Sequence, residues 1–149
     1  MLLPFTVFRR AVYLDMGGLW QRLPAGEDTH LFVRVGIGNP VCAVSVLGGI
    51  VKGNRADAGR LTSEHGPNTV KHWDYAVLLW KDILRRMPNL QPTYRRLLTW
   101  RIARAYWQKG FLSSKNFRLL SATQSVALSL FHDPSVAFRA VTRSLGRKG

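Results

Sequence analysis

Two neighbouring acidic residues, Glu27 and Asp28, are the side chains of this sequence best suited to acid–base chemistry. They follow Gly26, and the apolar residues after them recur at helical spacing, which predicts a helix over residues 27–35. The acidic pair would therefore lie in the first turn of that helix. Carboxylates in this position can complement the helix dipole, or they can take a proton from a bound hydroxyl group.

The segments around the pair predict short elements that would position it. Residues 5–8 are apolar with an interior threonine, which is typical of a buried strand. Residues 9–16 predict a short helix that ends at Gly17, where a left-handed C-cap is needed. Residues 41–46 are apolar and rich in β-branched side chains, so we expect a strand of the same sheet there.

Several motifs occur in a fixed order: a pair of arginines, a Gly-Gly followed by a large apolar residue, a Gly-Glu-Asp, and an apolar helix that carries an arginine. The residues are Arg9, Arg10, Gly17, Gly18, Leu19, Gly26, Glu27, Asp28, Leu31 and Arg34. This order resembles the acceptor half of a family 2 glycosyltransferase with the GT-A fold. The resemblance covers residues 5 to about 61, and beyond them it is a general likeness to the helical tails of such enzymes.

The resemblance implies the transfer of a sugar from a nucleotide sugar to a hydroxyl acceptor in glycan or polysaccharide synthesis. It implies that Asp28 is the catalytic base and that Glu27 is its neighbour. Inverting transfer needs such a base to remove the acceptor proton while the oxygen attacks the anomeric carbon. A helix N-terminus stabilises an anionic carboxylate and so weakens it as a base, which means that Glu27 and partial burial would have to act in the opposite direction.

Two further residues, Trp20 and Arg34, are the predicted acceptor-binding side chains. Trp20 could form an aromatic platform for a sugar, or it could fill the core beneath its loop. Arg34 could orient the acidic pair, or it could be solvated. Both alternatives stay open for each residue.

The chain contains no Asp-x-Asp motif, which the resembling family uses to hold a divalent metal on the nucleotide diphosphate. We therefore expect no metal site in this chain, although a complete enzyme of the family would use Mg²⁺ or Mn²⁺. The expected partners are a nucleotide sugar and a glycan or lipid-linked acceptor, once a nucleotide-binding half completes the protein. Alone, the chain is expected to be incomplete or inactive.

The formal net charge of +14 is unevenly distributed. Residues 1–66 hold seven basic and five acidic residues, whereas residues 67–149 hold fifteen and three. We predict two regions with this boundary: an acceptor-side part of a GT-A-like domain, and a basic helical C-terminal region. The expected fold class is α/β and mostly helical, with a partial GT-A-like sheet remnant followed by a bundle of about four helices.

The C-terminal region predicts those four helices from its apolar spacing. The first covers residues 71–87, and the second runs from residue 92 to Gly110. The third would be capped by Ser113 or Ser114, and the fourth would begin at the Asp-Pro pair of residues 133–134. The side chains that the third helix is expected to bury are Phe117, Leu120, Ala127, Leu128 and Phe131.

Two alternatives to a transferase remain for the basic half. Aromatic residues lie between its arginines and could stack on nucleic-acid bases; they are Tyr94, Trp100, Tyr106 and Trp107. The basic amphipathic helices could instead lie on an anionic membrane surface.

Cysteine content and hydropathy bear on the compartment. The only cysteine is Cys42, which favours a reducing compartment. The uncharged residues 35–51 fall short of the roughly 20 apolar residues that span a membrane, and no signal peptide is predicted. We expect a cytoplasmic protein that can be peripheral on the inner face of the membrane.

Overall fold

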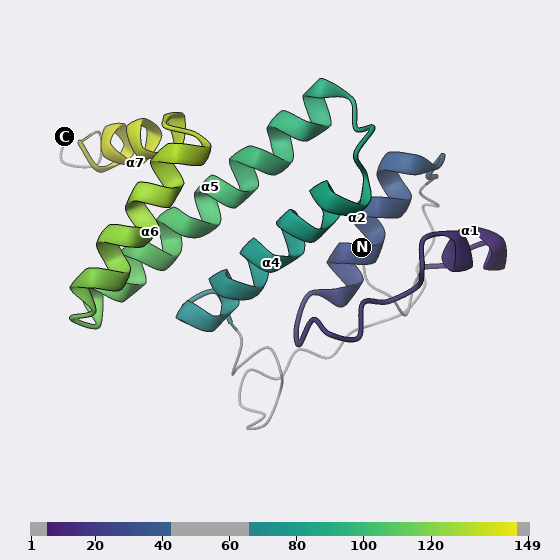
Figure 1. Cartoon of the computed structure of the whole chain (residues 1–149), viewed down its shortest axis with the longest axis horizontal. Coiled ribbons are helices and arrows are strands. Elements are labelled where there is room, and N and C mark those ends of the chain that lie inside the picture. Colours follow the sequence, from purple (N-terminus) through teal and green to yellow (C-terminus); the bar gives the residue numbers. More distant parts are fainter. Residues whose placement is uncertain (1–5, 43–65, 146–149) are drawn as a thin grey trace.

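The computed structural model of this chain describes residues 6–42 and 66–145, and these residues are mostly helical (Figure 1). The helices are α1 (Arg10–Asp15), α2 (Glu27–Gly38), α4 (Val70–Arg86), α5 (Pro92–Lys115), α6 (Leu119–His132) and α7 (Ser135–Leu145). No strand occurs in the two described ranges. The prediction of a mostly helical chain is therefore confirmed.

The predicted sheet remnant has no counterpart among the described residues. Residues 6–8 belong to neither a helix nor a strand, so the strand predicted over residues 5–8 is wrong for these three positions. Phe8 instead stacks on Phe32 of α2, with 5.7 Å between the ring centroids. An apolar segment that packs against a helix can bury its side chains without pairing to a strand. Of the second predicted strand, residues 41–46, only the first two are described, and they form no strand.

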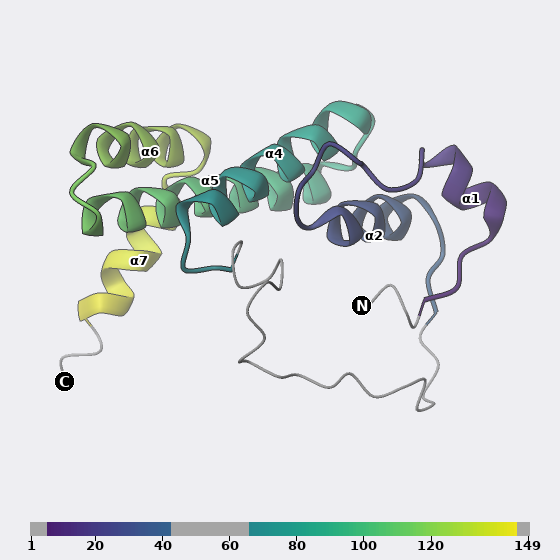
Figure 2. The ribbon, with the colours of Figure 1, turned by 90° about the horizontal axis from the view of Figure 1, so that it is seen from below.

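Helices α4 and α5 run side by side and carry the centre of the core (Figures 1 and 2). The Thr69 hydroxyl accepts a hydrogen bond from the backbone N–H of His72 and so caps α4. The turn that follows α4 contains Pro88, as its position in the sequence predicts. Ile83 of α4 and Ile102 of α5 are almost completely buried.

Helix α2 lies against α4 and extends this core to the N-terminal part of the chain (Figure 1). A cluster of buried residues includes Leu23 before α2, Leu79 in α4 and Leu98 in α5, and Val33 and Ile37 of α2 pack against it. Residues on both sides of position 66 therefore contribute to one core.

Helix α5 continues past Gly110, where the sequence predicted its end. The glycine lies beneath α6: a Cβ atom there would come within 3.0 Å of the Val126 side chain and 3.2 Å of the Ala122 carbonyl oxygen. Its small size is thus required for close packing of two helices, and it does not end the first of them. The helix ends instead at Lys115, before Phe117 adopts a φ of 56°.

Four of the five side chains that were expected to be buried by the third helix are exposed, and the fifth, Leu128, packs against the core as predicted. Phe117, Leu120 and Phe131, which were expected in the core, are 92%, 89% and 83% exposed. The side of α6 that faces α5 is formed by small residues, including Ala122, Ser125 and Ser129. The Ser129 hydroxyl donates a hydrogen bond to the Ala103 carbonyl over 2.8 Å. Small side chains let the two backbones approach closely, and the large apolar side chains are left outside.

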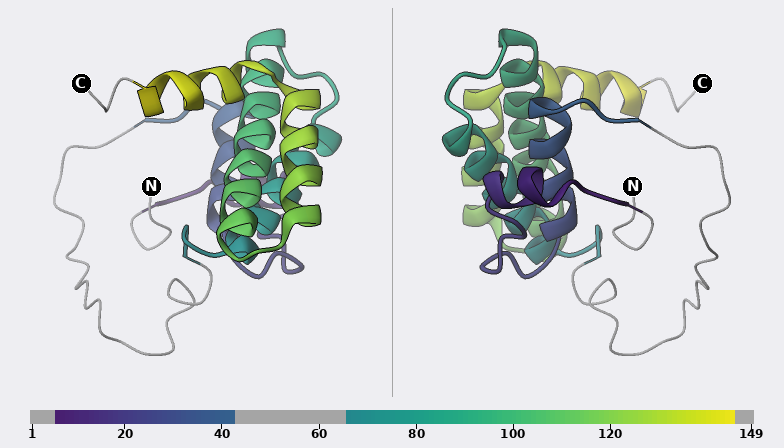
Figure 3. Two further views of the ribbon diagram at one scale, coloured as in Figure 1. Left: turned by 90° about the vertical axis from the view of Figure 1, so that its left-hand side faces the viewer. Right: turned by 90° about the vertical axis from the view of Figure 1, so that its right-hand side faces the viewer.

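Helix α7 begins as predicted, because the Asp133 carboxylate accepts a hydrogen bond from the backbone N–H of Ser135 over 2.9 Å. Figure 3 shows α7 turning away from the α5–α6 pair. Across the described ranges, no helix is both long enough and apolar enough to cross a bilayer.

The close contact at Gly110 generates a stability prediction. Gly110→Val should lower the free energy of unfolding by about 1–3 kcal/mol, because the added methyl groups collide with α6. Gly36→Ala is the matched control: a Cβ atom at this position would lie 4.0 Å from its nearest neighbour, so the change should be neutral or stabilising by up to about 1 kcal/mol. Urea denaturation followed by circular dichroism measures both effects. Equal midpoints for Gly110→Val and the parent chain would contradict close α5–α6 packing.

Candidate functional site

The loop between α1 and α2 depends on glycine at two of the positions singled out in the sequence. Gly18 has a φ of 62°, and a Cβ atom there would come within 3.0 Å of the Tyr13 hydroxyl oxygen. Gly26 has a φ of 85° at the N-cap of α2. Other residues rarely adopt these backbone conformations, so both positions require glycine.

The acidic pair lies in the first turn of α2, as predicted. Glu27 and Asp28 are both partly exposed. The Asp28 carboxylate accepts a hydrogen bond from the backbone N–H of Thr29 over 2.6 Å. This placement fits both chemical roles of the pair, because a partly exposed carboxylate can complement the helix dipole and can also meet a ligand hydroxyl.

Trp20 is half-buried and packs against the core cluster of α2, α4 and α5, as its core role predicts. Its ring lies 5.1 Å from the His30 ring between centroids. The guanidinium of Arg86 lies 5.8 Å from the indole centroid. Neighbours therefore occupy much of the indole surface that a sugar would need.

Arg34 is buried, with 3% of the residue exposed, so the solvated alternative for this side chain is wrong. Its guanidinium donates hydrogen bonds to the backbone carbonyls of Met16, Gly18 and His30. These three bonds all go to backbone atoms, and none goes to the carboxylates of the acidic pair. Arg34 therefore holds the loop after α1 against α2.

His30 and Asp82 form a buried pair that the sequence analysis missed. The His30 Nε2 atom lies 2.9 Å from the Asp82 carboxylate, and both side chains are almost completely buried. The same carboxylate accepts hydrogen bonds from Arg85 over 2.6 Å and from Arg86 over 2.5 Å. The periodicity of α2 could have placed His30 on the buried side with Leu31 and Arg34, but nothing in the sequence identifies a partner 52 positions away.

These groups have displaced pKa values. Burial, followed by the positive charge of Arg34, lowers the pKa of His30, and the contact with Asp82 only partly opposes this. Burial alone would raise the pKa of Asp82, but hydrogen bonds from Arg86, Arg85 and His30 outweigh it and lower that pKa. The pair is thus a neutral imidazole that donates to a charged carboxylate. The His30 Nδ1 atom has no hydrogen-bond partner in the described part of the chain, so a proton there would be buried without an acceptor.

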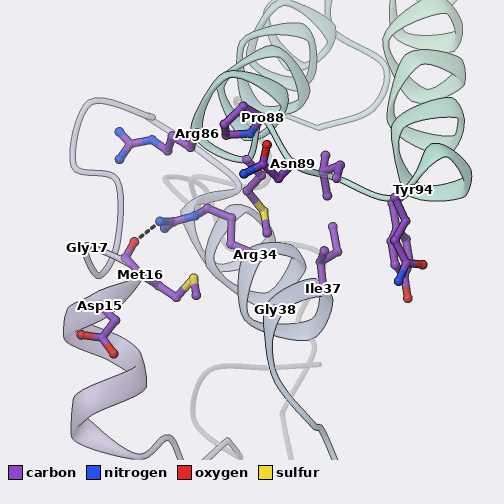
Figure 4. A pocket seen from close by; sticks show the side chains of 13 residues that line it. Asp15, Met16, Gly17, Arg34, Ile37, Gly38, Arg86, Pro88, Asn89 and Tyr94 are labelled. Carbon is purple, nitrogen blue, oxygen red and sulfur yellow. Dashed lines mark hydrogen bonds between the residues drawn. The ribbon is translucent and has the colours of Figure 1, made fainter.

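A cavity of about 630 Å³ lies where the end of α1, the C-terminal part of α2 and the α4–α5 connection meet (Figure 4). Asp15, Arg34, Asn89 and Tyr94 are among its lining residues. Of the four predicted site residues, only Arg34 lines it. Asp28 precedes Arg34 by six residues, on the order of 9 Å along a helix, so the cavity and the acidic pair lie toward opposite ends of α2.

The described residues do not fit the divalent metal that the resembling family uses. Residues 6–42 and 66–145 contain no group of three or more His, Cys, Asp or Glu side chains that could hold a metal ion.

Comparisons with protein-family models, with curated proteins and with solved structures give no match to this chain.

The position of Arg34 predicts a structural role for its guanidinium. Arg34→Lys keeps the charge but cannot reach three carbonyls, so we expect the free energy of unfolding to fall by about 2 kcal/mol or more. Arg22→Lys changes an exposed arginine and should stay within about 0.5 kcal/mol of the parent chain. Thermal and urea unfolding compare the variants, and equal stability of the two would show that Arg34 does not hold the loop.

The lowered pKa of His30 predicts acid sensitivity. As the pH falls below about 6.5, the unfolded chain binds a proton at this position more readily than the folded chain, so the free energy of unfolding should fall as pH drops. The contribution is at most about 1.4 kcal/mol per pH unit for one group. Burial and the positive charge of Lys81 also lower the pKa of His132, so this residue contributes to the pH dependence in the same direction.

Urea titrations between pH 7.5 and pH 5 measure this slope. His30→Gln keeps an N–H donor for Asp82 but cannot titrate, so its slope should be shallower and should retain only the part due to other groups, such as His132. An unchanged slope in His30→Gln, or a parent chain that gains stability on acidification, would contradict the prediction.

Proposed function

We propose that this chain is the acceptor-side part of a family 2-like glycosyltransferase that transfers a sugar from a nucleotide sugar to a hydroxyl acceptor in glycan or polysaccharide synthesis. Asp28 is the catalytic base in this proposal, and Glu27 is its neighbour. The groups that hold the nucleotide sugar come from a separate half, and alone the chain is inactive. Of the predicted GT-A-like sheet remnant, the proposal keeps only the second strand, of which residues 43–46 lie outside the described residues.

The observation that carries the proposal is the joining of the Gly-Gly loop to the Glu-Asp helix through Arg34. Its guanidinium donates to the carbonyls of Met16 and Gly18 while its backbone belongs to α2. Trp20, from the same loop, packs on His30, two residues after Asp28. The Gly-Gly loop and the Glu-Asp helix therefore form one local unit, which supports a shared role.

The chemistry assigned to Asp28 is a proton transfer. As an acceptor hydroxyl oxygen forms its bond to the anomeric carbon of the donor, the bond from that carbon to the diphosphate oxygen breaks. The acceptor proton passes to the Asp28 carboxylate, and the nucleoside diphosphate leaves with the bonding electron pair. Partial exposure at the start of α2 supports this role, because a hydroxyl group can reach the carboxylate from solvent.

The predicted acceptor-binding residues receive revised roles within the proposal. Arg34 is a positioning residue, because each of its three nitrogen atoms donates to a backbone carbonyl. Trp20 can meet an acceptor only with the part of the ring that His30 and Arg86 leave exposed. The acceptor is therefore bound mainly by its contact with the partly exposed acidic pair and the adjacent loop.

Nucleic-acid binding has less support, because two of the four aromatic residues that would stack on bases, Trp100 and Tyr106, already have close neighbours in the structure. Tyr106 is buried, and its ring stacks on His132 with centroids 5.7 Å apart. Arg101 and Arg104 lie 5.6 and 5.4 Å from the Trp100 ring centroid, so this indole already has cationic neighbours.

The proposal predicts the kinetic effect of Asp28→Asn. The chain is joined to the nucleotide-binding half of a family 2 glycosyltransferase, and nucleoside diphosphate release is measured with panels of nucleotide sugars and sugar acceptors. Loss of the base should lower kcat by roughly 10²–10⁴-fold, with a much smaller change in the acceptor KM.

Asp74→Asn is the matched control, since Asp74 is a partly exposed carboxylate on α4 outside the acidic pair and outside the cavity, and it should leave the rate unchanged. Calorimetry of the chain alone with nucleotide sugars and Mg²⁺ or Mn²⁺ should give no binding. The proposal is wrong if the joined protein transfers no sugar, if Asp28→Asn keeps the full rate, or if the chain alone binds a nucleotide sugar tightly.

A further inference from the structure

The exposed side of α6 carries an apolar surface that no described element covers. Seven positions on one side of the helix are exposed: Leu119, Leu120, Thr123, Gln124, Ala127, Leu130 and Phe131. Leu119 and Leu130 are 67% and 44% exposed, and Leu120 and Phe131 are more exposed still. We call these seven positions the α6 outer face. Five of the seven are apolar, and none carries a charge.

This face points away from the bundle because the opposite side of α6 packs against α5. Ala122, Ser125 and Ser129 are buried on that opposite side, and Figures 1 and 2 show α6 at the margin of the molecule, against α5. At the turn that leads into α6, Phe117 has a φ of 56° and is 92% exposed. An aromatic residue rarely adopts this conformation, and here it adds an exposed apolar side chain just before the first turn of α6.

Charge is absent from the face and concentrated beside it. Residues 119–131 include no Asp, Glu, Lys or Arg. Lys115 and Arg118 lie in the exposed stretch directly before α6, and the Lys115 amine lies 4.6 Å from the ring centroid of Phe111, another exposed apolar residue. The surface thus combines an uncharged apolar helix side with cations at its N-terminal end.

We propose that the α6 outer face binds the surface of an anionic lipid membrane. The helix lies parallel to the surface, its apolar side chains enter the boundary between headgroups and acyl chains, and Lys115 and Arg118 contact lipid phosphates. Apolar side chains next to basic residues are the composition of helices that bind membrane surfaces. This inference does not depend on the transferase proposal.

Charge complementarity favours a membrane over a second copy of the chain. Each chain carries a formal net charge of +14, so pairing two α6 outer faces would bring strongly cationic molecules together. An anionic bilayer attracts the same charge. The positive charge would also attract a nucleic acid. However, the thirteen residues 119–131 include no cation, so this side of α6 offers nothing for phosphates to bind.

Flotation of the full chain with lipid vesicles tests the proposal. The chain should float with vesicles of phosphatidylglycerol and phosphatidylcholine in equal parts, and only weakly with phosphatidylcholine alone. Leu120→Asp should lower the partition coefficient of the chain between membrane and water about tenfold or more, because it removes one highly exposed apolar side chain from the lipid contact. Lys115→Gln combined with Arg118→Gln should weaken binding to the anionic vesicles and reduce its dependence on salt.

Leu78→Asp is the matched control: Leu78 is 51% exposed on α4, outside the proposed contact, and its substitution should leave flotation unchanged. Circular dichroism should give the same melting curve for Leu120→Asp and the parent chain, since the side chain makes little contact with the core. As a second readout, an environment-sensitive fluorophore on Leu120→Cys, in a Cys42→Ser background, should shift to shorter wavelength with anionic vesicles, and one on Leu78→Cys should not.

Three results would overturn the proposal. The first is no flotation with anionic vesicles. The second is flotation that Leu120→Asp does not weaken, which would mean that charge alone binds the membrane. The third is a stable dimer in analytical ultracentrifugation that Leu120→Asp dissociates, which would assign the face to a second copy of the chain.

Discussion

A buried charged arginine and a buried carboxylate, Arg34 and Asp82, impose the main constraint on the N-terminal part of this structure. Removing either charge from water costs several kcal/mol unless hydrogen bonds replace the lost hydration. Arg34 replaces its lost hydration by donating hydrogen bonds to three backbone carbonyls. Asp82 replaces its own by accepting hydrogen bonds from His30, Arg85 and Arg86. These bonds form only when the α1 loop, α2 and α4 are correctly placed, so their relative positions follow from the need to satisfy the two groups.

Among the described residues, the C-terminal helices are held together by close packing and not by buried charged groups. Between α5 and α6 the contact consists of small side chains around Gly110, Ala122 and Ser129, which let the two backbones approach. Because α6 buries mainly small residues, most of its large apolar side chains are exposed. The exposed Leu120 and Phe131 therefore follow from the packing of the opposite side of α6, and they leave an apolar surface available for an external contact.

The candidate site was predictable where a local backbone requirement decides the residue. The glycines at positions 18 and 26 adopt positive φ values, and the acidic pair begins a helix, as the sequence indicates. The role of Arg34 was not predictable, because its partners are backbone carbonyls, which every residue carries and no sequence pattern marks. The same limit applies to His30, whose partner comes from another helix 52 residues away.

The sequence by itself determined most helices and several of their ends, because caps and apolar spacing act within a few residues: Thr69 before α4, Asp133 before α7 and Gly17 after α1 are examples. Only the tertiary structure decided which side of α6 is buried and that α5 continues through Gly110. Hydrophobicity alone predicted burial of the opposite side of α6, and the glycine at position 110 predicted a helix end. Burial depends on how closely two backbones can approach, and that distance is set jointly by residues on separate helices.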